Sequence, residues 1–220
     1  MQFNHINLIA KGIKAKRDIL IQARDLYNQE GLGITLAELA KRMNTTLGRI
    51  TYHFPTKDHL FIALAQLYEE KQMISRSKSL TGEYGLDKFI YRSMEGMDIQ
   101  YEYRCVIRYF AASIKTHNAV FEHLSTQFSS NNKLMLDVFS SLVKHGSLSE
   151  RLLQPDVFPV FLFKFVNLFT TWVISLEIYD SDKSYAEMKP IYLRGIFSSF
   201  VPFLTEKGNS EIQKTGLQLS

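Results

Sequence analysis

The sequence predicts an all-α protein of about nine helices, and three observations lead to that prediction. No stretch of the 220 residues alternates apolar and polar side chains as a strand would, and no repeat period is visible. Apolar residues recur instead at helical spacing in almost every segment. Two pairs, Thr35 with Glu38 and Ser184 with Glu187, have the spacing of capping boxes, which begin helices.

The composition is that of a globular protein, with 45% hydrophobic and 22% charged residues. A single cysteine, Cys105, excludes an intrachain disulfide and fits a reducing cytosol. The first residues lack the basic region and the apolar stretch that a signal peptide combines. We therefore expect a cytoplasmic protein.

Residues 157–178 are apolar over a length that could span a membrane. They include Lys164, Asn167 and Glu177, however, and Pro159 stands in the first turn. A charge at the centre of a bilayer costs about 2.5–3.5 kcal/mol on insertion scales. We predict a buried helix of a soluble protein, and no membrane partner.

The excess positive charge lies near the N-terminus. Residues 1–60 contain nine Lys or Arg and five Asp or Glu, whereas the rest of the chain contains 17 of each sign. Aromatic residues have the opposite distribution, since four of the 28 precede residue 61. The N-terminal quarter is thus suited to a polyanion, and the remainder to apolar burial.

The first two predicted helices cover residues 13–30 and 36–43. Gly31 and Gly33 end the first helix, and Thr35 caps the second. The apolar stripe of the first helix consists of Ile19, Leu20, Ala23, Leu26 and Tyr27. That of the second consists of Leu36, Leu39, Ala40 and Met43.

A third helix is predicted over residues 47–53, after a turn of Asn44, Thr45 and Thr46. Thr46 is its cap, and Pro55 stops it because the residue before a proline avoids helical angles. At about 100° per residue, one side holds Leu47, Ile50 and Phe54, and the other holds Gly48, Arg49, Tyr52 and His53. Thr56 then caps a fourth helix, which continues to about residue 77.

Further helices are predicted near 86–102, 104–116, 119–145, 156–179 and 185–206. Pro190 must kink the last of these or mark its true start. The domains expected from these elements are a helix-turn-helix domain at 1–56, a helical domain at 57–208 and a loose polar tail at 209–220.

The second and third helices have the dimensions of a helix-turn-helix. A seven-residue helix fits a major groove about 12 Å wide, and Arg49 can donate two hydrogen bonds to guanine. Hydroxyl groups and lysine near the same face can reach phosphates, which positions the helix without reading sequence. The predicted DNA-binding residues are Thr35, Thr45, Thr46, Leu47, Gly48, Arg49, Thr51, Tyr52, His53 and Lys57. The other interpretation is an ordinary solvated helix face.

The segment GITLAELAKRMNTTLGRITYHFPTKDHLF resembles the DNA-binding segment of TetR-family transcriptional regulators. The resemblance covers about a quarter of the chain, and its most specific part is G-x-I-x-Y-H-F-x-x-K-D-x-L, from Gly48 to Leu60. It implies a homodimer that binds a pseudo-palindromic operator in double-stranded DNA. It also implies a variable C-terminal domain for dimerisation and for a small effector.

Three positions depart from the common pattern of that family. Asn44, Thr45 and Thr46 stand where Gly-Val-Ser is usual, and Thr46 can still cap the helix. Thr51 replaces a common tyrosine, so one expected phosphate contact is lost. Because Arg49 replaces a small polar residue, the operator sequence cannot be taken from relatives.

The segment FPVFLFKFVNLFTTWVISLEIY is apolar almost all the way round, and a four-helix contact across a two-fold axis would cover it. The expected dimer-interface residues are Phe165, Phe169, Trp172, Phe197 and Phe200, with burial inside one chain nearly as plausible for each. The effector-binding candidates are Tyr91, Met94, Tyr109, Phe110, His117 and Trp172. Their aromatic character favours an apolar or aromatic effector, although such residues more often serve packing.

Catalytic signatures are absent from the sequence: there is no Gly-rich phosphate loop, G-x-S-x-G or H-E-x-x-H. We expect that the protein is not an enzyme and has no cofactor or metal site. We predict that Cys105 is a small buried packing residue. The leading hypothesis is a repressor that a small effector releases from its operator. One alternative is a DNA-bound architectural or cell-division adaptor without an effector. Another is a helical binding or enzymatic domain that merely contains a helix-turn-helix shape.

Overall fold

The computed structural model describes residues 2–77, 85–113, 122 and 134–219. The chain forms two compact units. Unit 1 comprises Met1–Glu69 with Tyr103–Thr126, and unit 2 comprises Glu70–Glu102 with Gln127–Ser220. The described residues are helical, as predicted, with one isolated antiparallel bridge between Leu148 and Leu204. The units interleave along the sequence, unlike the contiguous domains that the sequence suggested.

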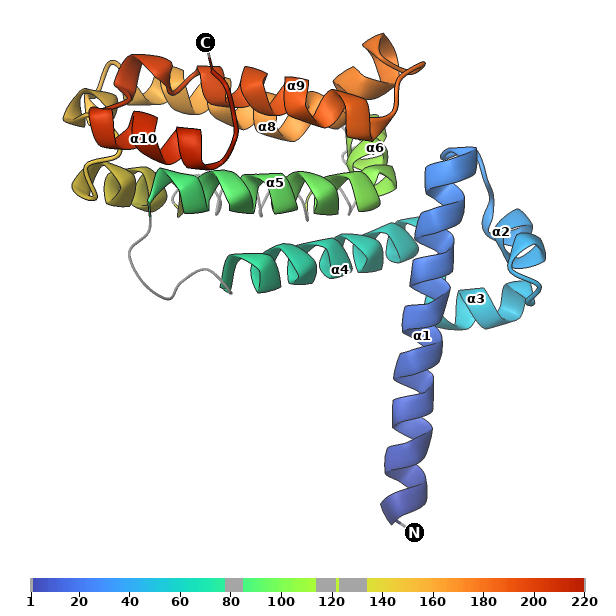
Figure 1. The fold of residues 1–220 in the computed structure, drawn as a ribbon. Helices are drawn as coiled ribbons and strands as arrows, with labels where there is room; N and C mark the ends of the chain where they lie inside the picture. Colours follow the sequence, from blue (N-terminus) through green and yellow to red (C-terminus); the bar gives the residue numbers. More distant parts are fainter. Residues whose placement is uncertain (1, 78–84, 114–121, 123–133, 220) are drawn as a thin grey trace. The chain divides into compact units, whose positions relative to one another are not determined.

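Unit 1 contains the helix-turn-helix. Its helices are α1 (Gln2–Glu30), α2 (Leu36–Arg42), α3 (Leu47–His53), the first part of α4 (Lys57–Ser77) and α6 (Arg104–Ser113). The helix α1 starts eleven residues before the predicted position 13, and its N-terminal half runs on beyond α3 (Figure 1). Gly12 costs a helix only about 1 kcal/mol, so it does not stop the extension.

Buried apolar residues from all these helices form the core of unit 1. Tyr27, Leu39, Ile50 and Phe61 are each 0% exposed. The Phe61 ring lies between two others, 4.9 Å from Tyr27 and stacked at 3.8 Å on Tyr109 of α6. The predicted stripes of α1 and α2 therefore point inward and hold the short helix α3 from behind.

Unit 2 is a helical layer around a cluster of phenylalanines. Its elements are the end of α4, α5 (Leu86–Glu102), a helix at 134–144, η1 (Glu150–Leu153), α8 (Phe158–Tyr179), α9 (Tyr185–Ser198), η2 (Val201–Phe203) and α10 (Glu206–Lys214). In Figure 1, α8 and α9 lie side by side, and α10 packs on α5. Ser184 and Glu187 form the predicted capping box of α9, which runs through Pro190 but ends at Ser198 instead of 206.

The phenylalanine cluster corrects the predicted dimer interface. Phe165, Trp172, Phe197 and Phe200 are at most 3% exposed within one chain, so a second chain cannot reach them. Phe200 packs against Phe165 and Phe197 with centroid distances of 5.5 and 5.1 Å. The Trp172 indole N–H donates to the amide oxygen of buried Gln100 at 2.5 Å. These four residues are core, and only Phe169 is partly exposed.

The expected loose tail is instead the helix α10. Its Glu211 carboxylate is buried and accepts hydrogen bonds from the Ser147 hydroxyl at 2.6 Å and the Leu86 N–H at 2.9 Å. The His145 ring nitrogen lies 3.2 Å from the same carboxylate. A Cβ atom at Gly208 would lie 2.1 Å from the Ser147 carbonyl oxygen, so only glycine allows this approach. The expectation of a loose tail at 209–220 does not hold for residues 209–214, which belong to this helix.

Only one side of α8 is buried within the chain. Phe161, Phe165 and Leu176 face inward, whereas Val160 and Phe163 are 54% and 69% exposed. Among the described residues α8 is the one helix with the length and composition to cross a membrane, and 28% of its apolar window is buried. Core helices of soluble proteins pass the same test, so this is weak evidence for a membrane span.

Candidate nucleic-acid interface

The turn between α2 and α3 depends on one residue with a left-handed backbone. Asn44 has φ of +50°, and it is the position where the family pattern usually has glycine. Asparagine adopts this conformation more readily than other residues with a side chain, because its short amide bonds locally. The Thr45 N–H then donates to the Ala40 carbonyl at 2.9 Å, which closes the turn.

Thr46 caps α3, as predicted, and sets its direction. The Thr46 hydroxyl accepts a hydrogen bond from the Arg49 N–H at 3.2 Å. Ile50 and Phe54 anchor the inner side, being 0% and 1% exposed. Leu47, which the pattern assigned to the same inner side, is 44% exposed at the N-terminal end of the helix. Leu47 therefore belongs to the outer surface, next to Gly48.

The outer face of α3 is open. Gly48 is exposed, and a Cβ atom there would meet nothing within 4 Å, so the chain's own packing does not require glycine. Arg49 is exposed, and the described residues offer its guanidinium no ion-pair partner. Tyr52 is 83% exposed. A thin N-terminal end, an unpaired cation and a projecting phenol lie together on one short helix.

Two of the predicted DNA-binding residues on α3, Thr51 and His53, also make contacts within the protein. The Thr51 hydroxyl donates to the Leu47 carbonyl at 3.0 Å, so its proton is used within the helix and the oxygen remains as an acceptor. The ring of His53 is half-buried and packs edge-on against Tyr52 at a centroid distance of 5.0 Å. His53 thus supports the position of the Tyr52 ring.

Lys57, at the start of α4, is largely committed to the fold of unit 1. Its ammonium donates to the carbonyls of Leu32 and Ile34 and lies 5.1 Å from the centre of the Tyr27 ring. Burial lowers the pKa of Lys57, and the negative charges of Asp58 and Glu38 oppose that effect. An ammonium has three N–H donors, and the two carbonyls use two of them. The predicted phosphate contact of Lys57 can therefore use only the third donor.

Thr35 closes the predicted capping box at the start of α2. Its hydroxyl accepts from the Glu38 N–H at 3.2 Å, and the Glu38 carboxylate accepts from the Thr35 N–H at 2.8 Å. The Thr35 N–H and hydroxyl both lower the pKa of Glu38. The structure therefore places Thr35 at an exposed helix start, where a phosphate contact remains a prediction.

Sequence reasoning missed the way α6 holds the helix-turn-helix. The phenol of Tyr109 donates to the Asp58 carboxylate at 2.5 Å, and the Cys105 N–H donates to the Asn28 side chain at 2.9 Å. The Arg108 guanidinium donates to the Tyr27 carbonyl at 3.1 Å. Burial raises the pKa of Cys105 to about 12, which fits its predicted role as a packing residue. These partners are 51 to 81 residues apart in the sequence, so no local pattern reveals them.

The effector-binding candidates do not gather at one place. Tyr109 and Phe110 belong to unit 1, whereas Tyr91, Met94 and Trp172 belong to unit 2, and His117 lies outside the described residues. Trp172 is buried core, and the Tyr91 phenol donates to the Lys214 carbonyl at 3.1 Å. Trp172 is thus explained by packing, whereas Tyr91 is 51% exposed, and an effector role for Tyr91 and the others remains a prediction.

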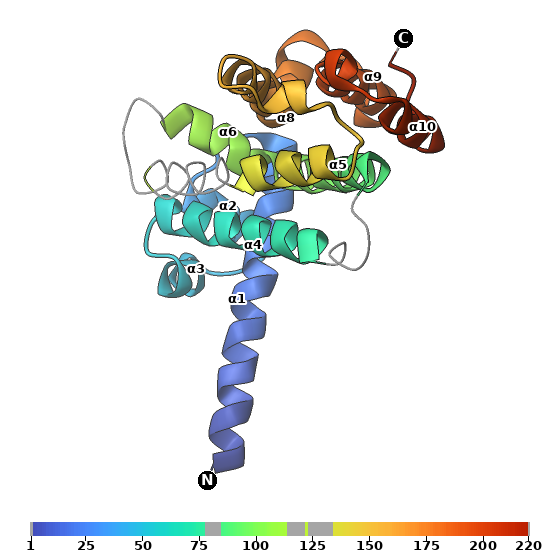
Figure 2. The ribbon, with the colours of Figure 1, turned by 90° about the vertical axis from the view of Figure 1, so that its left-hand side faces the viewer.

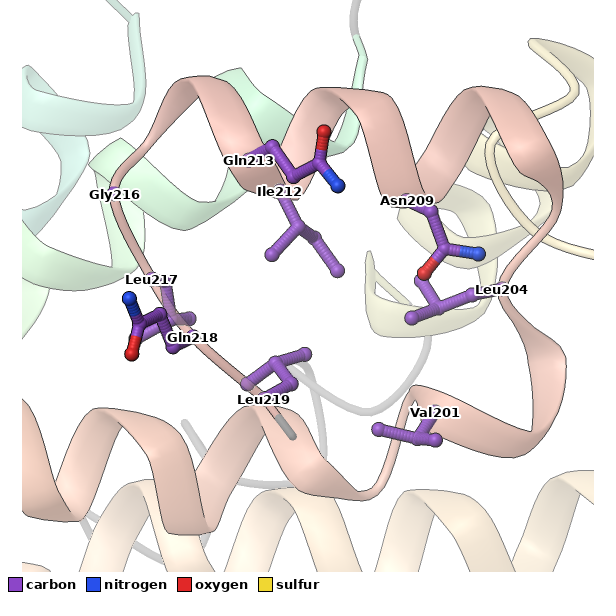
Figure 3. A pocket seen from close by; sticks show the side chains of 9 residues that line it. All are labelled: Val201, Leu204, Asn209, Ile212, Gln213, Gly216, Leu217, Gln218 and Leu219. Carbon is purple, nitrogen blue, oxygen red and sulfur yellow. The ribbon is translucent and has the colours of Figure 1, made fainter.

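Two hollows are present on unit 2, and neither is lined by a predicted effector residue. Figure 3 shows one of about 640 Å³, where Ile212, Asn209, Leu219 and Val201 converge. Its full lining is Val201, Leu204, Asn209, Ile212, Gln213, Gly216, Leu217, Gln218 and Leu219. The other, of about 460 Å³, includes the exposed α8 residues Val160, Lys164 and Leu168.

The fold and the exposed face of α3 define a helix-turn-helix DNA-binding protein. The family model for bacterial regulatory proteins of the tetR family matches residues 19–64, which span the end of α1 to the first turns of α4. Together with the similar proteins described next, this match supports a TetR-family transcriptional regulator, and members of that family are DNA-binding regulators.

Similar proteins cover nearly the whole chain. The HTH-type transcriptional regulator QacR of Staphylococcus aureus (strain Mu50 / ATCC 700699) is 24% identical over 188 residues, which are 82% of this chain and 97% of that protein. A TetR-family transcriptional regulator from Marinobacter aquaeolei VT8 has a TM-score of 0.77 at 18% identity, covering 91% of this chain and 97% of the other. A gamma-butyrolactone receptor (ArpA like protein) has a TM-score of 0.65 at 15% identity, and the match covers 93% of this chain and 94% of the other. The structural similarities extend the shared fold beyond the helix-turn-helix.

Proposed function

We propose that this protein is a dimeric, sequence-specific transcriptional regulator of the cytoplasm that leaves its operator when a small effector binds. The observation that carries the proposal is the outer face of α3, with exposed Gly48, a projecting Tyr52 and an exposed Arg49 that has no ion-pair partner among the described residues. An arginine at this position can donate two hydrogen bonds to guanine O6 and N7. Tyr52 and Thr46 would contact flanking phosphates.

The exposed side of α8 supports dimerisation. Val160, Phe163 and Leu168 are 54%, 69% and 43% exposed, and Val160 lies between the other two on one broad side of the helix. Large exposed apolar patches mark interaction sites, and a two-fold axis lets one surface cover itself. Two α3 helices held about 34–36 Å apart would then read a pseudo-palindromic operator. Phe169, which is partly exposed, is the one predicted interface residue that we retain.

An effector can release the protein only if it binds the released conformation better than the DNA-bound one. One similar structure is a gamma-butyrolactone receptor, and a receptor for a small molecule on this fold is consistent with such control. The helix α4 starts beside the helix-turn-helix and ends in unit 2, so it belongs to both units. A displacement of α4 would change the spacing of the two α3 helices.

Selection of bound duplexes from a random DNA pool, combined with size-exclusion mass measurement, tests the proposal. We expect a pseudo-palindromic consensus, a dimer and an affinity that falls steeply with salt. A monomer that binds no duplex at low ionic strength would overturn it. A dimer that binds DNA but whose affinity no apolar or aromatic compound changes would favour the alternative of an architectural adaptor.

A further inference from the structure

The net excess of positive charge in this chain lies in the first half of α1. Residues 1–17 contain four Lys or Arg and no Asp or Glu, whereas residues 18–60 contain five of each sign and residues 61–220 contain 17 of each. The formal net charge of +4 is therefore carried entirely by the segment 1–17. Residues 18–60, which include the helix-turn-helix, are neutral in sum, so the segment 1–17 supplies the net positive charge that attracts a polyanion such as duplex DNA.

This basic segment is a helix that continues past the recognition helix. Figures 1 and 2 both show the N-terminal half of α1 projecting beyond α3. Residues 2–12 add about 16 Å of helix at 1.5 Å per residue. The buried residues of α1 begin at Ile19, so the side chains described before it, from residue 12 on, serve no core.

The contacts of the described side chains place the basic segment beside the end of α3. The Lys16 ammonium lies 5.6 Å from the centre of the Phe54 ring, and Phe54 is the residue that directly follows α3. Lys14 is exposed, and the described residues provide it with no ion pair. Arg17 is exposed three residues further on, so these two side chains are neighbours on the helix surface.

We propose that the N-terminal half of α1 is a second DNA-binding element, which lies along the phosphates that flank the half-site read by α3. This proposal rests on the proposed function and adds a specific surface to it. A basic helix without acidic residues is complementary to a polyanion, and its contacts would strengthen binding without reading bases. An anionic lipid surface would suit the same charges, but the position next to α3 favours DNA.

The test uses the full-length protein with Lys11→Gln and Lys14→Gln together. Glutamine has a helix propensity similar to that of lysine, so α1 remains helical. Because each of the two protomers loses two lysines, the slope of log affinity against log salt should become shallower by about 3.6, and the affinity ratio between 50 and 200 mM salt should shrink by about two orders of magnitude. The charge-matched control is Lys144→Gln with Arg151→Gln, two exposed residues of unit 2, which should leave the slope unchanged.

Shortening the operator duplex to the two half-sites gives a second readout. The wild type should lose affinity on the short duplex, and the Lys11/Lys14 variant should lose little. An unchanged slope, or an equal change in the control, would overturn the proposal. Binding to phosphatidylglycerol vesicles that the variant loses, with an unchanged DNA slope, would overturn it in favour of a membrane surface. A wild type that binds no duplex would instead refute the proposed function as a whole.

Discussion

Asn44 is the residue on which the geometry of the helix-turn-helix depends. Its φ of +50° costs most residues with a Cβ atom about 1–2 kcal/mol, whereas asparagine and glycine tolerate it. We expect Asn44→Ala to lower the free energy of unfolding by about 1 kcal/mol and Asn44→Gly to change it little. Urea unfolding of the two variants and the wild type would measure these differences in the free energy of unfolding. Equal destabilisation by Ala and Gly would mean that the asparagine side chain, and not the backbone conformation, matters.

Arg49 is the residue that we expect to read a base. Replacing it by alanine should cost about 1–3 kcal/mol on the best operator and relax the preference at one base pair, because a bidentate contact to guanine is lost. Affinities for a set of single-base operator variants would measure this. Arg151→Ala, an exposed arginine of unit 2, is the control. If Arg49→Ala weakens all sequences equally, Arg49 contacts a phosphate instead.

At the scale of elements, α6 holds the start of α4 through a polar contact. The phenol of Tyr109 donates to Asp58 at 2.5 Å while its ring stacks on Phe61. Burial and the Asp58 carboxylate both raise the pKa of Tyr109, so the proton stays on the phenol. Tyr109→Phe keeps the stacking and removes a hydrogen bond to a charged group, which should lower the stability by about 1.5–3 kcal/mol. Thermal unfolding with Tyr179→Phe, an exposed tyrosine, as control would test this.

The helix α10 is fastened by a buried carboxylate whose effect depends on pH. Burial by itself raises the pKa of Glu211, but the hydrogen bonds from Ser147 and Leu86 and the nearby His145 lower it below its ordinary 4.5. Because the folded protein holds the charged form more tightly, this stabilisation is present above about pH 4.5 and is lost as the pH falls through the lowered value.

Glu211→Gln should therefore cost about 1.5–3 kcal/mol near pH 7, since the charge-assisted hydrogen bonds weaken. The difference from the wild type should shrink as the pH falls below about 4.5. Chemical unfolding between pH 3 and pH 8 would measure it. Glu206→Gln removes an exposed charge from the first turn of the same helix and should cost less than about 1 kcal/mol. If the stability difference between Glu211→Gln and the wild type did not change with pH, the charged Glu211 carboxylate would not be what stabilises the fold.

The sequence predicted those elements whose signals are local. Thr35 with Glu38, Thr46 and Ser184 with Glu187 each begin a helix at the predicted residue, because a cap and its partner are three residues apart. The helix α10 was missed, because Glu211 is stabilised by Leu86, 125 residues away, and by Ser147, 64 residues away. The polar segment around it therefore carries no local sign of burial.

The same reasoning applies to the site. The position of α3 and its exposed face could be predicted because a motif and a turn identify them within a few positions. Most of the predicted interface residues are buried within one chain, and the sequence could not show this because α8 is apolar on all sides, so its composition does not say which side the chain covers itself. Phe165 is 3% exposed and Phe163, two residues earlier, is 69% exposed. Only the positions of α5 and α9 distinguish the two rings.

For the molecule as a whole, recognition of a two-fold operator requires two copies of the chain. A single α3 of seven residues contacts few base pairs, and specific affinity comes from joining two such contacts at a fixed spacing. The outer side of α8 offers Val160, Phe163 and Leu168 for that purpose. The hollow of about 460 Å³ that includes Val160 and Leu168 lies on this side, where side chains of a second copy could fill it.

Phe163→Ser should weaken the dimer and, through it, DNA binding. Burying a phenylalanine side chain contributes about 1.5–3 kcal/mol, and a two-fold interface contains it twice, so the dimer association constant should fall at least tenfold. Sedimentation equilibrium and operator titration would measure the two effects. Met73→Ser, which removes a similarly exposed apolar residue (68%) from α4, should change neither. A Phe163→Ser protein that stays dimeric at nanomolar concentration would place the interface elsewhere. If it becomes monomeric yet keeps full operator affinity, reading by a single α3 must suffice, and the two-fold mechanism fails.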